Sequence, residues 1–164
     1  MQYVKIIFGV EFMSIILLSA LIIILDQVSK FIIRDNFLEY QRYKLVGDYF
    51  YFTFIKNRGA AFGILSGQRT FFIIITIAFI FFAIYIYQKE LPKNLLSKFA
   101  VSFLLGGSIA NLIDRVLKHY VTDFIAFDLL SFYKLPVINI ADIFIFFGVV
   151  LLIYELLFLV DRGD

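Results

Sequence analysis

Residues 140–160 read IADIFIFFGVVLLIYELLFLV, an apolar run with one aspartate, Asp142, close to its start. A hydrocarbon core of about 30 Å is crossed by roughly 20 helical residues, so this run has the length of a transmembrane helix. Three further runs meet the same criterion, at Phe12–Ile33, Thr70–Tyr87 and Leu95–Val116. With 62% hydrophobic and only 17% charged residues among 164, the chain is too apolar for a soluble domain. We therefore predict an all-α polytopic membrane protein with four transmembrane helices.

One sizeable polar region, about residues 35–69, separates the first two predicted helices. Its centre, from Tyr43 to Lys56, is rich in aromatic and β-branched residues, which favour strands. Tyrosine and phenylalanine also suit the boundary between lipid and water. We expect a small β-rich subdomain there, lying on the bilayer surface between helices 1 and 2. The chain has no internal repeat or low-complexity linker, so we expect a single membrane-embedded domain over residues 1–164.

The composition also excludes several classes of chemistry. The chain has no cysteine and a single histidine, His119, so thiol chemistry is excluded and a zinc site would need carboxylates almost alone. We expect neither a metal nor another cofactor. The net charge of +2, without a basic run interleaved with aromatic residues, gives no reason to expect a nucleic-acid partner.

Two polar motifs in the first half of the chain are consistent with simple structural roles. Asp26 and Lys30 are four residues apart, so an ion pair on one helical face accounts for them as well as a functional role does. The stretch from Asn57 through Gly59 to Gly63 is a run of small residues after the predicted sheet, where a glycine-dependent turn is the plain interpretation.

The third predicted helix carries a further polar motif at its end. Asn111, Asp114 and Arg115 share one face, because they lie at positions i, i+3 and i+4. Arg115 beside Asp114 favours the ionised carboxylate, so we predict that Asp114 is a scaffold acid rather than a catalytic one. The preceding small residues Gly106, Gly107, Ser108 and Ala110 are typical of close helix packing in membranes.

Asp123 and Asp142 stand apart from these motifs. Asn139 is a good N-cap, and Asp142 three residues later suits the first turn of the fourth helix. Asp123 lies between apolar residues just after the third helix, without a cap role or a helical charge partner. Because the third helix ends on the membrane face where the fourth begins, the connecting segment can bring the two acids together. A carboxylate beside hydrocarbon is a functional hypothesis by default, and two of them can share one proton.

Five motifs in order carry a family resemblance over nearly the whole chain: Asp26-Gln27-Val28-Ser29-Lys30, Asn57-Arg58-Gly59-Ala60-Ala61-Phe62-Gly63, Asn111-Leu112-Ile113-Asp114-Arg115, Val121-Thr122-Asp123-Phe124 and Asn139-Ile140-Ala141-Asp142. Together with the four spans, they resemble the bacterial lipoprotein signal peptidases, signal peptidase II. The resemblance implies an aspartic endopeptidase that removes signal peptides from prolipoproteins, cutting before a diacylglyceryl-modified cysteine.

The resemblance also assigns residues. It implies that Asp123 and Asp142 are the catalytic pair, and that the following residues line or brace the site: Asp26, Asn57, Gly59, Asn111, Asp114, Arg115, Asn139 and Ala141. From the residues themselves, Asp142 near a helix N-terminus is the better candidate for the ionised partner, and Asp123 among apolar neighbours for the protonated one.

The implied setting is the bacterial inner membrane, with both termini inside and the active site near the outer face. A raw count of basic residues favours the opposite orientation, and we follow the resemblance. The expected partners are the lipidated prolipoprotein and membrane lipids, and we expect a monomer. The alternative from another class is a small proton-coupled membrane transporter, since membrane carboxylates also relay protons, followed by a non-enzymatic assembly factor.

Overall fold

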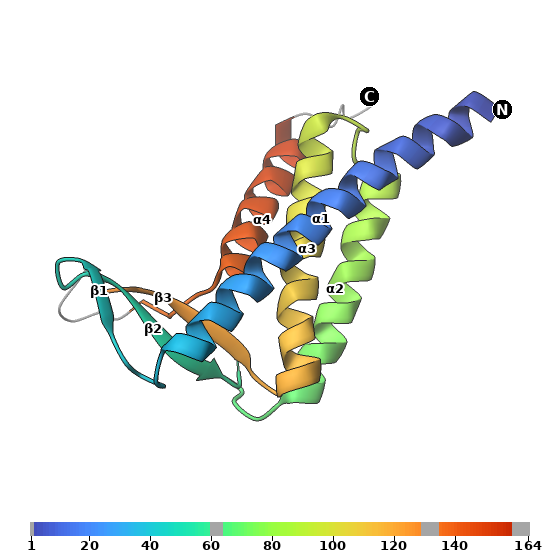
Figure 1. Ribbon diagram of the computed structural model, residues 1–164. Helices are drawn as coiled ribbons and strands as arrows, with labels where there is room; N and C mark the ends of the chain where they lie inside the picture. The colour runs from blue at the N-terminus through green and yellow to red at the C-terminus, as the bar shows by residue number, and fades with distance from the viewer. Residues whose placement is uncertain (1, 60–63, 129–134, 159–164) are drawn as a thin grey trace.

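The computed structural model describes residues 2–59, 64–128 and 135–158, and the side chains from residue 12 onward. Within these residues the chain forms four long helices (Figure 1), each apolar and long enough to cross a membrane: α1 Gln2–Asn36, α2 Arg69–Lys89, α3 Leu95–Lys118 and α4 Ile140–Phe158. The four predicted spans are confirmed, with α1 extending beyond both predicted bounds and α2 and α3 extending by one or two residues at an end. The predicted end of the fourth span, Val160, lies outside the described residues.

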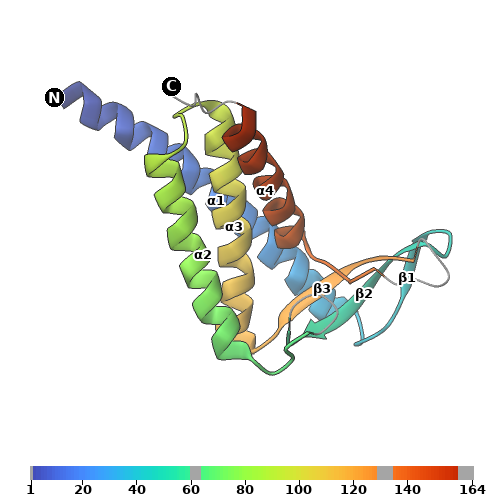
Figure 2. The same cartoon turned by 180° about the vertical axis from the view of Figure 1, so that it is seen from behind.

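Helix α3 is the centre of the bundle and packs against the other three helices (Figures 1 and 2). The small residues of its middle explain how this is possible. A Cβ atom added to Gly107 would lie 2.5 Å from the carbonyl oxygen of Ala141 on α4, and one added to Gly106 would lie 3.0 Å from the carbonyl oxygen of Ser19 on α1. The expected packing role of these glycines is therefore confirmed, because any side chain there would push α3 away from its neighbours.

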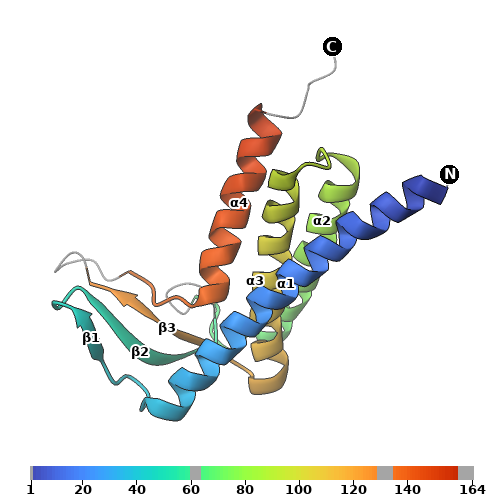
Figure 3. The same ribbon diagram turned by 45° about the horizontal axis from the view of Figure 1, so that its top comes forward.

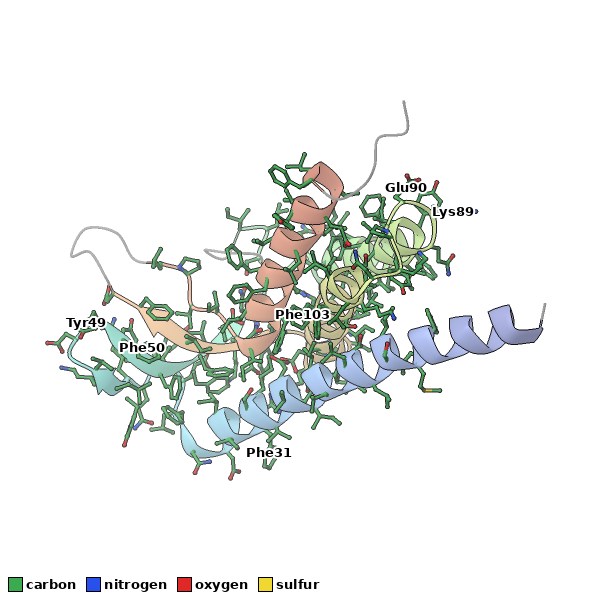
Figure 4. The ribbon with its side chains drawn as sticks, turned by 90° about the horizontal axis from the view of Figure 1, so that it is seen from above. Phe31, Tyr49, Phe50, Lys89, Glu90 and Phe103 are labelled. Carbon is green, nitrogen blue, oxygen red and sulfur yellow. The ribbon has the colours of Figure 1, made fainter. Side chains whose placement is uncertain are left out.

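The outer helices present large apolar side chains to the surroundings. Phe31 on α1 is 61% exposed and points away from the other helices (Figure 4), and Phe81 on α2 and Phe146 on α4 are similarly exposed. A soluble protein rarely exposes contiguous apolar surface of this kind. These faces therefore suit contact with lipid.

The described strands form one antiparallel sheet in the order β1, β2, β3, with bounds β1 Tyr43–Val46, β2 Phe50–Asn57 and β3 Val121–Phe127. The predicted sheet between helices 1 and 2 is confirmed in β1 and β2. Strand β3, which lies between α3 and α4 and carries Asp123, was not predicted. Asp123 pairs in register with Ile55 of β2, so the sheet gives it fixed neighbours.

The sheet lies at one end of the bundle, beside the end of α1 and the start of α4 (Figures 1 and 3). A buried cluster of Ile33, Phe54, Phe124 and Ile125 joins it to α1. The turn between α2 and α3 and the last residues of α4 lie at the opposite end, where Asn94 donates a hydrogen bond to Glu155. The described polar motifs from the sequence analysis lie at the sheet end.

Candidate active site

Asp123 is held by two amide donors in the middle of β3. Its side chain is 2% exposed. Asn57 Nδ2 donates to its Oδ2 at 2.8 Å, and Asn139 Nδ2 donates to its Oδ1 at 2.7 Å. Burial, together with the neighbouring charge of Asp142, raises the pKa of Asp123 from 3.8 to about 7, although the two amide donors act to lower it. The folded protein therefore keeps a proton on Asp123 over a pH range in which an ordinary aspartate has lost it.

Asp142 lies in the first turn of α4, and the predicted N-cap is confirmed. Asn139 Oδ1 accepts the Asp142 N–H at 2.9 Å, and Asp142 Oδ2 accepts the Asn139 N–H at 3.1 Å. This reciprocal arrangement is a capping box, which fixes both side chains relative to the helix start. The second oxygen of Asp142, Oδ1, accepts a hydrogen bond from Asn111 Nδ2 at 2.8 Å.

Both acids face the same cavity of about 250 Å³, which we call the aspartate cavity. Its lining residues come from β2, the segment after it, α3, β3, the segment before α4 and the start of α4: Asn57, Gly59, Asn111, Arg115, Val121, Asp123, Pro136, Val137, Ile138 and Asp142. Asn139 connects the two acids, because its amide nitrogen binds Asp123 while its carbonyl oxygen binds the Asp142 backbone. The fold thus brings together the two acids that the sequence analysis paired.

Asn57 and Gly59 form the turn expected after the predicted sheet. Asn57 Oδ1 accepts the Gly59 N–H at 2.9 Å, an Asx turn in which Asn57 Nδ2 still donates to Asp123. Gly59 is buried and contributes to the wall of the aspartate cavity. The rest of this motif, from Ala60 to Gly63, lies outside the described residues.

A buried ionic cluster lies behind the aspartate cavity. Lys30 Nζ lies 2.7 Å from Asp26 Oδ2 and 3.3 Å from Asp114 Oδ2, and all three side chains are fully buried. Asp26 Oδ1 accepts the Ala141 N–H at 2.9 Å, so an acid from α1 caps the start of α4. The expected ion pair between Asp26 and Lys30 is confirmed, but it belongs to a larger network than one helix can provide.

The ion pairs of Asp114 are with two lysines rather than with the neighbouring Arg115. Asp114 pairs with Lys118 at 2.5 Å and with Lys30, and its Oδ2 accepts the Thr122 N–H at 3.1 Å. Arg115 lies on the wall of the aspartate cavity instead, with its guanidinium 5.2 Å from the ring centre of Phe72. Adjacent residues on a helix point about 100° apart, so neighbours in sequence seldom form an ion pair with each other. Asp114 nevertheless contacts the backbone of β3, as a scaffold acid would.

Two further cavities adjoin the aspartate cavity. One, of about 360 Å³, lies between α2, α3 and α4 and has mostly apolar walls that include Ile75, Phe79 and Ile145, and we call it the helix cavity. It shares Asn111, Arg115 and Asp142 with the aspartate cavity. The other, of about 300 Å³, is the sheet cavity, which shares Asn57, Asp123, Pro136 and Val137 and continues along Lys56, Arg58 and Ser66. The two acids therefore lie between a cavity among the helices and a cavity beside the sheet whose lining includes the charged residues Lys56 and Arg58.

Among the described residues, no group of three or more His, Asp or Glu side chains is placed to hold a metal ion. The aspartate cavity contains two acids, three amide or guanidinium side chains and apolar walls. Two buried acids of which one holds a proton near neutral pH can act together as general acid and general base.

Comparison with known proteins places this geometry in a family. The family model of signal peptidase (SPase) II matches residues 18–158. Lipoprotein signal peptidases of Staphylococcus aureus strains MRSA252 and Newman are 39% identical over 142 residues, which cover 87% of this chain and 86% of each relative. Two solved structures, described as bacterial membrane enzymes determined by the in meso method, are also similar. One, at 2.3 Å resolution, has a TM-score of 0.82 and 37% identity and covers 92% of both chains. The other, at 1.9 Å, has a TM-score of 0.79 and 39% identity and covers 88% of this chain and 93% of its own. The chain belongs to the signal peptidase II family.

Proposed function

We propose that this peptidase is of the aspartic type and removes signal peptides from prolipoproteins by cutting before a diacylglyceryl-modified cysteine, with Asp123 and Asp142 as its catalytic pair. The observation that carries the proposal is that both acids line one cavity and are connected through Asn139. The family provides the substrate class. Membership of a peptidase family gives no support to the alternative of a proton-coupled transporter.

The reaction follows from the different surroundings of the two acids. Asp142, in the first turn of α4 with two N–H donors on its oxygens, is the ionised partner, because the helix N-terminus stabilises negative charge. Asp123, whose pKa is about 7, is the protonated partner. Asp142 takes a proton from a water molecule as the water oxygen attacks the scissile carbonyl carbon, and Asp123 gives its proton to the carbonyl oxygen. The product of this step is a neutral gem-diol without a covalent bond to the enzyme.

Collapse of the gem-diol reverses the roles of the two acids. Asp142, now protonated, gives its proton to the leaving amide nitrogen, while Asp123 regains a proton from one gem-diol hydroxyl as the C–N bond breaks. The pair ends the cycle with one proton, as it began. Because the two carboxyl groups are neighbours, the pKa values measured by titration belong to the pair rather than to either residue.

The supporting residues divide by what they touch. Asn57, Asn111 and Asn139 donate hydrogen bonds to the pair, while Gly59 and Arg115 line the cavity. We propose that Arg115 helps to bind the peptide carbonyls, since a guanidinium offers several donors. The remaining supporting residues, Asp26, Asp114 and Ala141, act through the backbone beside the pair.

The adjoining cavities suggest how the substrate lies. A signal peptide and two acyl chains are apolar and arrive from the membrane, so we assign them to the helix cavity and the lipid-facing surface around it. The mature polypeptide is polar, so we assign it to the sheet cavity beside Lys56 and Arg58. The scissile bond then lies between the two acids.

We propose that the protein is located in the bacterial inner membrane, with the sheet and the aspartate pair near the outer face and both termini in the cytoplasm. The start of α1 and the end of α4 lie at the same end of the bundle, opposite the sheet, which agrees with this orientation (Figure 1). The short basic turn between α2 and α3, with Lys89, Lys93 and Lys98, also lies at that end, as the positive-inside rule favours. We further propose that the chain works as a monomer with one domain.

The direct test is to incubate the purified protein in detergent with a lipidated prolipoprotein and to identify the product by mass spectrometry. The expected product begins at the lipidated cysteine. Asp142→Asn should abolish cleavage with the protein still folded, because an amide cannot accept the proton of the attacking water. Cleavage at another position, or wild-type turnover by the Asp142→Asn variant, would refute the proposal.

A further inference from the structure

Lys30 has three polar contacts near the aspartate pair, and the sequence analysis gave it no role beyond an ion pair. Its ammonium group lies 2.7 Å from Asp26 Oδ2, 2.8 Å from Asn111 Oδ1 and 3.3 Å from Asp114 Oδ2. An ammonium carries three hydrogens and no acceptor, so its three neighbours match its three donors. The side chain is fully buried, so these contacts are shielded from solvent.

The contact with Asn111 differs from the two carboxylate contacts because it neutralises no charge. A carboxamide has an acceptor oxygen on one side and a donor nitrogen on the other. Lys30 can only donate, so Asn111 Oδ1 must face Lys30. Asn111 Nδ2 therefore faces Asp142 Oδ1, to which it donates at 2.8 Å. Asn139 Nδ2 also donates to Asn111 Oδ1, at 3.2 Å, and holds the amide in the same orientation.

The orientation of this amide affects which acid carries the shared proton. As oriented, Asn111 offers a donor to Asp142, which suits an ionised carboxylate. If the amide turned over, its oxygen would face Asp142 and could bind only a protonated carboxyl group. The proton would then be favoured on Asp142 rather than on Asp123, and the proposed general base would be occupied.

We propose that Lys30 is a positioning residue of the peptidase, which fixes the amide of Asn111 so that Asp142 always receives a donor and the shared proton stays on Asp123. This inference rests on the proposed roles of Asp123 and Asp142. Lys30 contacts Asp142 through one side chain, that of Asn111, and the charge of its ammonium group also acts through space on both acids. The other charged groups that face Asp142 are Arg115 of α3 and Asp123 of β3.

A purely structural role for Lys30 would be to neutralise Asp26 and Asp114. The structure supplies a variant that separates the two roles. Replacing Lys30 alone would leave two buried acids short of a partner and could unfold the protein. The double replacement Asp26→Asn with Lys30→Met removes one charge of each sign, and Asp114 keeps its pair with Lys118. This charge-balanced variant should fold, while Asn111 Oδ1 loses its ammonium donor and keeps only the longer contact from Asn139 Nδ2.

The control is Lys118→Met. Lys118 also pairs with Asp114 and donates to Gln27, whereas Asn111 receives its ammonium donor from Lys30. The charge-balanced variant and Lys118→Met therefore each remove one ammonium contact to Asp114. If Lys30 acts only through charge neutralisation, the charge-balanced variant and Lys118→Met should both affect the enzyme through its thermal stability alone.

The experiment measures kcat and KM separately on one lipidated precursor between about pH 5 and pH 9, a range that brackets the pKa of Asp123, with thermal unfolding of each variant. The charge-balanced variant should keep a KM near that of the wild type and lose about 100-fold in kcat, the scale expected when a catalytic group is misplaced. Its pH profile should change, since the proton is no longer confined to Asp123. Lys118→Met should keep the wild-type profile.

Asn111→Leu provides the decisive comparison. If Lys30 acts through Asn111, adding the charge-balanced replacement to Asn111→Leu should cause little further loss in kcat, because coupled residues are not additive. The inference would be overturned if the charge-balanced replacement lowered kcat by the same factor in the wild type and in Asn111→Leu. It would also be overturned if the charge-balanced variant kept the kcat and pH profile of the wild type. If the wild type itself left the lipidated precursor uncut, the proposed function would fail instead, and the two failures are distinguishable.

Discussion

Replacing Asp123 by asparagine should abolish cleavage and also change how the stability of the protein depends on pH. Asparagine holds no transferable proton, so the proposed general acid is lost. The stability effect follows from burial, which raises the pKa of Asp123 from 3.8 to about 7. Between these two values the folded protein binds a proton that the unfolded chain has lost. Stability therefore falls as the pH rises through this window, by about 1.4 kcal/mol for each pH unit.

The total effect of this titration is about 4 kcal/mol by about pH 8. An asparagine at position 123 does not titrate, so the variant lacks this loss. The substitution is nevertheless destabilising at low pH. Both oxygens of Asp123 accept hydrogen bonds, from Asn57 and Asn139, and the introduced amide nitrogen would face one of these donors. An unsatisfied buried donor costs about 1–3 kcal/mol. We therefore expect the variant to be less stable than the wild type near pH 4 and more stable near pH 8.

The assay is thermal unfolding in detergent at pH values from about 4 to 8, the window set by the two pKa values, beside cleavage of a lipidated precursor. The control is Asp48→Asn, which makes the same chemical change in the exposed turn between β1 and β2. Lys44 lowers the pKa of Asp48, so its small contribution to the pH dependence has the opposite sign. If the Asp123→Asn and wild-type stability curves run parallel across this range, the folded protein does not hold a proton on Asp123 and the assigned roles are wrong.

Three further predictions concern the substrate, the turn and the topology. A precursor whose cysteine lacks the diacylglyceryl group should show a much lower kcat/KM, since each buried methylene contributes about 0.8 kcal/mol of binding. Equal kcat/KM values for the lipidated and unlipidated precursors would mean that the acyl chains are not recognised. Gly59→Val should reduce cleavage without a large change in melting temperature, because Gly59 lines the aspartate cavity and its N–H donates to Asn57. Undiminished turnover would show that this turn does not contact the substrate. Cysteines introduced at Asp48 and Lys56 should react with an impermeant reagent at the outer face of intact inner membranes, whereas labelling only after the membrane is opened would place the sheet in the cytoplasm.

The helices were predictable because hydropathy is a local property, and the pairing of Asp123 with Asp142 was predictable because an acid beside apolar segments seldom has a structural role alone. Strand β3 was not predictable in the same way. The stretch from Val121 to Phe127, VTDFIAF, is short and does not alternate between polar and apolar residues, and six of its seven residues are buried. Runs of this kind do not distinguish a strand from a loop or a helix end. Only the partner strand β2, more than 60 residues earlier, defines it.

The contacts of the buried cluster show a second limit. Lys30 and Asn111 are 81 residues apart, and Asp26 and Ala141 are 115 residues apart. A single sequence contains no signal for pairs at this separation, whereas the ion pair between Asp26 and Lys30 follows from helical spacing. The lysine partner of Asp114 from α1 shows the same limit. Proximity along the chain suggested a partner for Asp114, but the packing of α1 against α3 supplied Lys30 instead.

The cluster around Lys30 also gives a reason for retaining buried charges in a membrane, where they are costly. Asp26 binds the N–H of Ala141, next to Asp142, and Asp114 binds the N–H of Thr122, next to Asp123. Lys30 contacts both of these scaffold acids. The backbone beside each proposed catalytic acid is therefore attached to one ammonium group through one carboxylate. Because apolar packing is non-directional, a hydrophobic substitute could fill the same volume without fixing where α4 and β3 begin relative to each other. The ionic cluster restricts the relative position of α4 and β3 through directional contacts. The proposed sharing of a proton between Asp123 and Asp142 depends on that relative position.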